Sequence, residues 1–97
     1  MSGYTHGVLR PYDPSEAIPP QAAALIARRD QSTIKSWAET FHLGRKIAGR
    51  WEISHPALLM FLDGDEGALR AYLSGDRQSE CVLKYFERAG LLQAKTA

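Results

Sequence analysis

The sequence predicts one small, mainly α-helical domain that contains a single β-hairpin. Three observations lead to this class. Apolar residues recur at helical spacing in several short segments, and capping residues separate these segments. One stretch alternates between apolar and polar residues on both sides of an Ala-Gly pair. The length of 97 residues, with 44% apolar and 24% charged residues, is typical of one soluble globular domain.

Composition excludes several classes of protein. The chain has 12 Lys plus Arg and 11 Asp plus Glu, so its net charge of +1 indicates no polyanion partner unless basic residues cluster locally. The longest apolar run is too short for a transmembrane helix, and residues 1–7 do not resemble a signal peptide. The single cysteine, Cys81, cannot form a disulfide within the chain, so we expect a cytoplasmic protein.

Residues 1–19 form a first segment, which we predict to be an arm that is flexible or draped over the domain. Four of the five prolines lie in residues 11–20, and the apolar residues show no period. A turn is expected at Asp13-Pro14-Ser15.

Two helices follow in the sequence. Pro20 suits the first position of a helix that ends near Arg28. Asp30 is a good N-cap for a second helix over about 31–40. Ile34, Trp37, Ala38 and Phe41 lie on one face of this second helix, and its opposite face is polar and small.

The hairpin is predicted over residues 43–53. Leu43, Arg45 and Ile47 alternate with Gly44 and Lys46 before an Ala48-Gly49 turn. Trp51 and Ile53 continue the alternation after the turn, and Gly49 can adopt the positive φ that a tight turn needs.

Three more helices are predicted in the C-terminal part. Ser54 caps the first, which ends at Asp63-Gly64-Asp65, and the next covers 66–73. Asp76 is expected to cap a last helix over about 77–89, followed by Gly90 at its C-terminal end. Its apolar positions at 82, 83, 85 and 86 can cover the core or pair with a second copy.

The first two helices and the hairpin together suggest nucleic-acid binding. Helices separated only by Arg28-Arg29-Asp30 form a helix-turn-helix pattern, and the polar face of the second is slim enough for a major groove about 12 Å wide. Gln31 can pair with adenine, and Lys35 can reach guanine or a phosphate. Residues 28–50 contain six basic and two acidic residues, whereas residues 54–97 contain five basic and six acidic ones. The positive charge therefore lies where phosphate contacts are needed.

The stretch AALIARRDQSTIKSW at 23–37, followed by GRKIAGRWEI at 44–53, resembles the excisionase type of winged helix-turn-helix, within the superfamily of mercury-resistance-type (MerR-like) regulators. The resemblance covers roughly residues 21–62. It implies a recognition helix in the major groove and a wing on the backbone or the minor groove. Two positions depart from the pattern: Arg28 replaces the usual turn glycine, and Asp30 replaces the usual cap serine. The DNA-binding residues that the resemblance and the charge pattern predict are Arg28, Arg29, Gln31, Ser32, Thr33, Lys35, Ser36, Arg45, Lys46 and Arg50.

Other chemistry-bearing residues favour structural interpretations. Trp37 and Trp51 fall on the apolar phase of their elements, so we expect them in the core rather than stacked on bases. Cys81 is expected to be a small buried side chain, with redox sensing as the alternative. The three histidines lack metal-ligand spacing, and no catalytic motif or phosphate-binding glycine loop is present. We therefore expect no enzyme activity, no cofactor and no metal.

The resulting hypothesis divides the chain into an arm (1–19), a winged helix-turn-helix core (20–62) and C-terminal helices (63–97) that pack on the core or mediate oligomerisation. The protein is expected to bind double-stranded DNA, in the cytoplasm on the nucleoid. Its role is that of an excisionase-like architectural factor in DNA recombination or of a small transcription regulator. Further possible partners are a second copy of the chain and a recombinase or polymerase subunit, but not a membrane. The alternative is a protein-interaction module that uses the helix-turn-helix as a scaffold without binding DNA.

Overall fold

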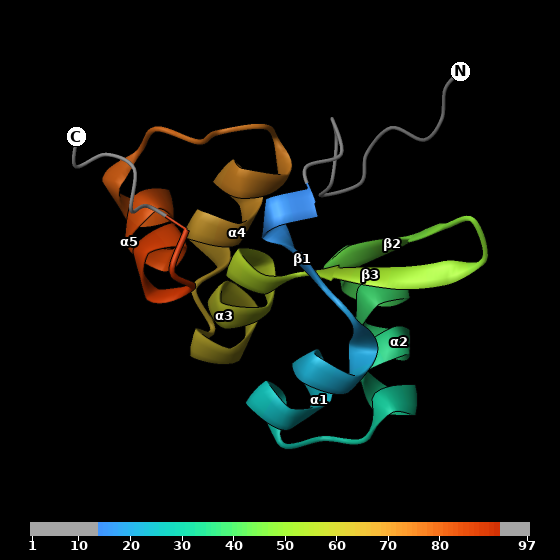
Figure 1. Cartoon of the computed structure of the whole chain (residues 1–97). Helices are drawn as coiled ribbons and strands as arrows, with labels where there is room; N and C mark the ends of the chain where they lie inside the picture. Colours follow the sequence, from blue (N-terminus) through green and yellow to red (C-terminus); the bar gives the residue numbers. More distant parts are fainter. Residues whose placement is uncertain (1–13, 92–97) are drawn as a thin grey trace.

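The computed structural model describes residues 14–91, which are mainly helical with a small antiparallel sheet (Figure 1). This confirms the predicted class in its coarse form. The chain begins with the 3-10 turn η2 (Pro14–Glu16) and the short strand β1 (Ala17–Ile18). The remaining elements, in chain order, are α1 (Pro20–Ala27), α2 (Gln31–Phe41), β2 (Gly44–Ile47), β3 (Arg50–Ser54), α3 (His55–Asp63), α4 (Glu66–Leu73) and α5 (Glu80–Arg88).

The sheet is antiparallel, with strand order β1-β3-β2. Ile47 pairs with Arg50, so Ala48 and Gly49 alone form the predicted turn between β2 and β3. Their φ angles of 53° and 82° are both positive, which matches the twist of a two-residue hairpin turn. Gly44 is required where β2 begins, because a Cβ there would collide with the carbonyl oxygen of Glu52.

Strand β1 was not predicted from the sequence. Its two residues pair with Ser54 and Ile53 at the end of β3. A strand of two residues carries no readable alternation, so its existence depends on the partner strand. The segment before α1 is therefore part of the sheet from Ala17 onward. The rest of the predicted arm, residues 1–13, lies outside the described residues.

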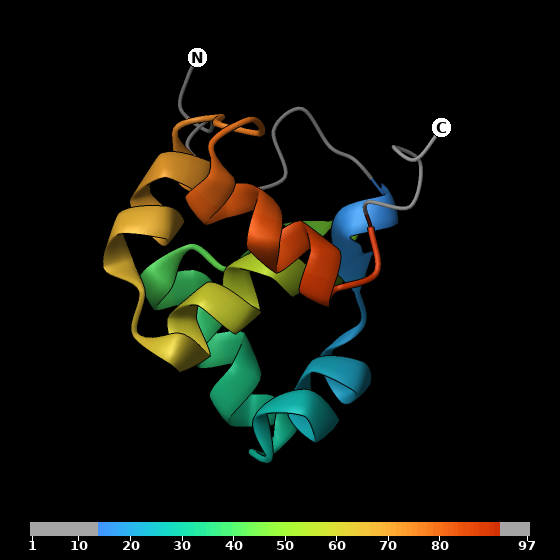
Figure 2. The same ribbon diagram turned by 90° about the vertical axis from the view of Figure 1, so that its left-hand side faces the viewer.

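One apolar core joins all five helices and the sheet. Helix α3 lies at its centre and contacts α1, α4, α5 and β3 (Figures 1 and 2). The buried apolar residues are Ala23, Ile34, Ala38, Leu43, Ile53, Ala57, Leu58, Met60, Ala68, Tyr72, Val82, Tyr85 and Phe86. Trp37 and Trp51 are half-buried and pack against this core, as predicted.

Local hydrogen bonds set the helix starts. The side chain of Asp30 accepts a hydrogen bond from the Thr33 N–H, and that of Ser54 accepts one from the Ala57 N–H. Both residues are the predicted N-caps. Asp65 caps α4 in the same way, through the Ala68 N–H.

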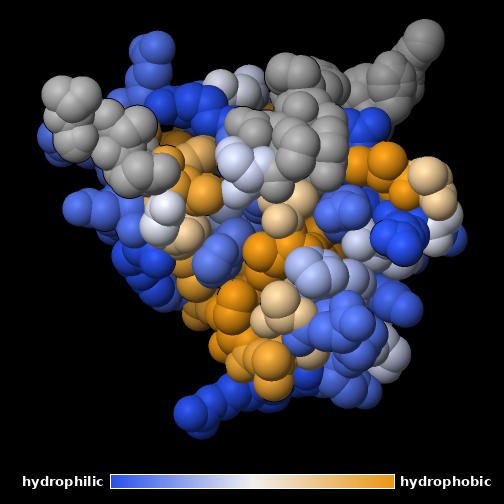
Figure 3. Space-filling view, in the orientation of Figure 1, coloured by the Kyte–Doolittle hydropathy of each residue, from blue (hydrophilic) through white to orange (hydrophobic). Residues whose placement is uncertain are grey.

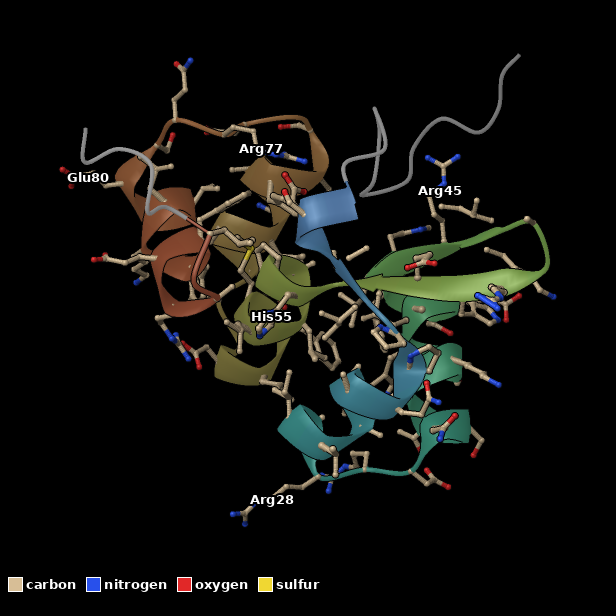
Figure 4. All side chains as sticks on the ribbon, in the orientation of Figure 1. Arg28, Arg45, His55, Arg77 and Glu80 are labelled. Atoms are coloured by element: carbon tan, nitrogen blue, oxygen red, sulfur yellow. The ribbon has the colours of Figure 1, made fainter. Side chains whose placement is uncertain are left out.

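The predicted start of the last helix was wrong by three residues. Asp76 does cap backbone, but its Oδ1 accepts the N–H groups of Gln78 and Ser79 and holds residues 76–79 as a turn. Helix α5 begins only at Glu80. Arg77, labelled in Figure 4, therefore lies outside the helix, and its side chain donates a hydrogen bond to Glu16.

The exposure of Cys81 corrects a second expectation. Its side chain is exposed rather than buried. Val82, Tyr85 and Phe86 are the residues that α5 buries, and Cys81 lies outside this set in the first turn of the helix.

A buried polar cluster, formed by Glu16, Ser54, Tyr72 and Arg77, connects the N-terminal segment to the last two helices. The guanidinium of Arg77 donates from Nε and Nη2 to the two carboxylate oxygens of Glu16, each at 3.1 Å. The Tyr72 hydroxyl donates to Glu16 Oε1 at 2.6 Å and lies 2.7 Å from Ser54 Oγ. Burial raises the pKa of Tyr72 well above its usual range, so this hydroxyl stays protonated. The cluster fixes where the chain enters the sheet ahead of α1.

Candidate nucleic-acid interface

The outer face of α2 is polar and accessible, in the phase that the sequence predicts. Gln31, Ser32, Lys35, Ser36 and Glu39 are all exposed there. The opposite face supplies Ile34 and Ala38 to the core. Helix α2 thus presents side chains with hydrogen-bonding groups, one positive charge at Lys35 and one negative charge at Glu39 to solvent.

The N-terminal end of α2 is capped by Asp30, which is hydrogen-bonded to side chains in the first turn of the helix. The Asp30 carboxylate accepts the hydroxyl of Thr33 through Oδ1 and the hydroxyl of Ser32 through Oδ2. These bonds, led by the one from Thr33, lower the pKa of Asp30, so it carries a full negative charge at neutral pH. Because the hydroxyls of Ser32 and Thr33 already donate hydrogen bonds to Asp30, these two residues are weaker candidates for contacting a ligand. The negative cap also disfavours a phosphate at this helix end.

The hairpin divides its basic residues between two faces. Opposite residues of an antiparallel pair share a face, so Lys46 lies on the same face as Trp51. Arg45 is paired with Glu52, and Arg50 is paired with Ile47, so both arginines lie on the other face. Figure 4 shows Arg45 on the side of the sheet away from α2.

A groove of about 560 Å³ lies between the start of α1, the N-terminal half of α2 and the hairpin. It follows the edge of β3 that β1 leaves uncovered, since β1 pairs only with Ile53 and Ser54. The groove brings together three of the predicted residues, Gln31, Lys35 and Arg50. Its lining is completed by Pro19, Pro20, Gln21, Gly49, Trp51 and Glu52.

Charge in this groove, which we call the β3 groove, is mixed but positive in sum. Lys35 and Arg50 contribute two positive charges, and Glu52 contributes one negative charge. Positive charge next to amide groups suits a phosphate-bearing ligand. The Glu52 carboxylate weakens that field.

The structure separates the remaining predicted residues from the β3 groove. Arg28 and Arg29 are exposed in the turn between α1 and α2, where Arg28 points away from the domain at the tip opposite the sheet (Figure 4). Arg28 adopts the left-handed conformation with φ of 60° that commonly ends a helix. Ser36 and Lys46 are exposed but do not line the groove.

Sequence reasoning missed Gln21 and Glu52 in this site. Gln21 belongs to the first turn of α1, and β1 brings that turn beside β3. The sequence places Glu52 in the predicted hairpin, but its position in the groove depends on β1, the strand that was not predicted. No local sequence signal pointed to either position.

The described residues hold no cluster of three or more His, Cys, Asp or Glu that could bind a metal ion. His55 is half-buried at the start of α3, and burial lowers its pKa. Within the same part of the chain, every helix is too short or too polar to span a bilayer.

Comparisons of the chain with family models, curated proteins and solved structures found no match.

Proposed function

We propose that this chain binds double-stranded DNA in the manner of a winged helix-turn-helix protein. In this proposal α2 enters the major groove, and the β2–β3 hairpin is the wing that lies on the adjacent backbone or minor groove. The observation that carries the proposal is the β3 groove, which Gln31, Lys35 and Arg50 all line. A single duplex could contact all three.

Within this proposal the basic residues have different roles. Gln31 and Lys35 lie on the exposed face of the helix that would approach base edges. Arg50 would bind a phosphate beside the groove. Arg45 does not line the β3 groove and is expected to contribute less than Arg50.

The test is fluorescence anisotropy of a pool of labelled duplexes, titrated with the full-length protein at several salt concentrations. About four to six phosphate contacts give a slope of log K against log salt of about −4 to −5. Lys35→Ala and Arg50→Ala should each weaken binding, and loss of a phosphate contact should make the slope shallower by about 1. Lys84→Ala is the matched control, because Lys84 is an exposed lysine on α5, outside the β3 groove.

Glu52→Gln gives a sharper test of the same site. Removing the negative charge from the groove should strengthen DNA binding, since the carboxylate repels phosphates. Unchanged affinity in this variant would place the duplex elsewhere on the surface. Absence of binding by the wild type at low salt would reject DNA binding and favour the protein-interaction alternative, with a recombinase or polymerase subunit as the kind of partner to test.

The biological role follows from how the protein uses DNA. An excisionase-like architectural factor bends its site and binds neighbouring repeats, whereas a small transcription regulator binds a palindrome. Selection of bound sequences from a random pool, followed by a gel assay of bending, separates these two roles.

A further inference from the structure

A second groove lies between the C-terminal end of α2, α3 and α4. Its volume is about 350 Å³, and it shares no lining residue with the β3 groove. We call it the α4 groove, and its principal lining residues are Phe41, Phe61, Leu69, Leu73, Glu66 and Arg70. In Figure 2, α4 and the end of α2 lie at the side of the molecule opposite α1's first turn. A ligand here would leave the β3 groove open.

The floor of the α4 groove is apolar and incompletely covered. Phe41 is 43% exposed, although its ring lies 4.9 Å from the Phe61 ring. Leu69 and Leu73 stand one helical turn apart on α4 and are half-buried. Covering these side chains would remove apolar surface from water, which favours association.

The rim of the α4 groove carries one charge of each sign. Glu66 and Arg70 are exposed and lie one helical turn apart on α4. Ion pairs found among residues 14–91 join Arg77 with Glu16, Lys84 with Asp65 and Arg88 with Asp63, so they include neither rim residue.

This arrangement is complementary to itself. If two copies meet across a two-fold axis with their α4 helices antiparallel, Glu66 faces Arg70 of the partner subunit, and Arg70 faces Glu66 of the partner subunit. The same register brings Leu69 of each copy close to the two-fold axis, where it can make apolar contact with Leu69 of the partner subunit. A partner whose rim carries charges of a single sign would place a like charge against either Glu66 or Arg70, and the two would repel each other.

We propose that the α4 groove binds a second copy of this chain in a two-fold dimer. The occupant is α4 of the other copy, held by apolar contact in the groove and by two reciprocal Glu66–Arg70 pairs. Helix α4 has eight residues and is about 12 Å long, so the interface is small and the dimer weak. A dissociation constant on the order of 100 μM is expected.

The exposed apolar side chains elsewhere do not favour the same conclusion. Leu25 and Ile26 on α1 and Leu62 on α3 are exposed apolar residues. Figure 3 shows that apolar side chains gather on the surface of this part of the molecule. Leu25 is 81% exposed, but neither it nor Ile26 or Leu62 lines the α4 groove. These residues therefore serve as a control surface.

The experiment is sedimentation velocity of the full chain in low salt, without DNA, from about 10 μM to about 1 mM. The wild type should shift from monomer to dimer over this range. Arg70→Glu and Glu66→Arg should each weaken the dimer about tenfold, because each replaces two attractive contacts by two repulsive ones. The combined variant Glu66→Arg/Arg70→Glu restores complementary charges and should recover the wild-type association.

Two controls keep the result specific. Glu87→Arg reverses an exposed charge on α5, and Leu25→Ala trims the other apolar surface, so both should dimerise like the wild type. Circular dichroism confirms that each variant is folded. A wild type that stays monomeric, a single reversal without effect, or a swapped pair that fails to recover would each overturn the proposal. Because DNA is absent, the outcome is independent of the proposed DNA binding.

Discussion

Two carboxylates in this protein, Asp30 and Glu16, each accept several hydrogen bonds, but one is exposed with local partners and the other is buried with distant ones. Asp30 is exposed, and its hydrogen bonds reach only Ser32 and Thr33 in the next turn of the chain. Glu16 is buried, and it binds Tyr72 and Arg77, which lie 56 and 61 positions later in the sequence. The first interaction organises one helix end, whereas the second joins distant elements.

The comparison shows that the carboxylate beside the candidate site and the carboxylate that stabilises the domain lie in different parts of this fold. The exposed cap shapes the end of α2 beside the β3 groove, so changes there act locally. The buried cluster closes the domain around α4 and the start of the sheet. A buried charge that loses its partner costs far more than an exposed one, because burial removes the water that would otherwise solvate it.

The largest effect is expected from breaking the buried cluster with Arg77→Ala. Glu16 is 4% exposed, so its carboxylate would keep Tyr72 but lose the guanidinium. The free energy of unfolding should fall by about 3 kcal/mol, at the lower end for a broken buried pair because Arg77 is partly exposed. Urea denaturation measures the change.

A matched pair of variants sharpens this prediction. Arg70→Ala removes an exposed arginine outside the cluster and, at micromolar concentration, should change stability by less than about 0.5 kcal/mol. Adding Glu16→Gln to Arg77→Ala removes the unpaired charge and should recover part of the loss. A loss below about 1 kcal/mol for Arg77→Ala alone would show that the cluster is not a stabilising element.

An intermediate effect is expected at Asp30, where the cap has a pH signature. The folded pKa of Asp30 lies below the ordinary 3.8, so between the two values the unfolded chain binds more protons. The stabilisation by Asp30 is therefore present above pH 3.8 and is lost as the pH falls through the folded pKa. Asp30→Ala should melt a few degrees below the wild type at pH 7.

Other aspartates with lowered pKa values, Asp63, Asp65 and Asp76, titrate in the same range, so only the difference between wild type and variant isolates Asp30. Thermal melts of both proteins should converge at a pH well below 3.8. A difference in melting temperature that is constant from pH 7 to pH 2 would exclude a role for the Asp30 charge.

The smallest effect is expected at Arg28, and it has the opposite sign. Arg28 holds φ of 60° at the end of α1, a conformation that costs an L-residue about 1 kcal/mol relative to glycine. Arg28→Gly should therefore raise the free energy of unfolding by about 0.5–1 kcal/mol. Arg29→Gly is the control for the loss of charge in the same turn, and it should not stabilise the protein. Equal changes in both variants would show that charge, rather than backbone strain, decides the effect.

Much of the fold could be predicted from single segments of sequence. The caps at Asp30 and Ser54, the Ala48-Gly49 turn and the helical phase of α2 depend on residues within about four positions of one another. The candidate site was predicted in part for the same reason. The helical period of the apolar residues in α2 predicts its polar face. That period does not predict that this face lies beside Arg50.

The sequence by itself therefore determined most of the helices, the β2–β3 hairpin, the caps at Asp30 and Ser54 and the polar face of α2, because local hydrogen bonds and periodicity specify these. The tertiary structure alone decided which residues share a site. It added β1 to the sheet, placed Glu52 in the β3 groove and left Arg45 outside it. It also delayed α5 to Glu80, where the turn at Asp76 leaves Arg77 free to reach Glu16. These outcomes depend on contacts between residues far apart in the chain, and their energy exists only once the core has brought the segments together.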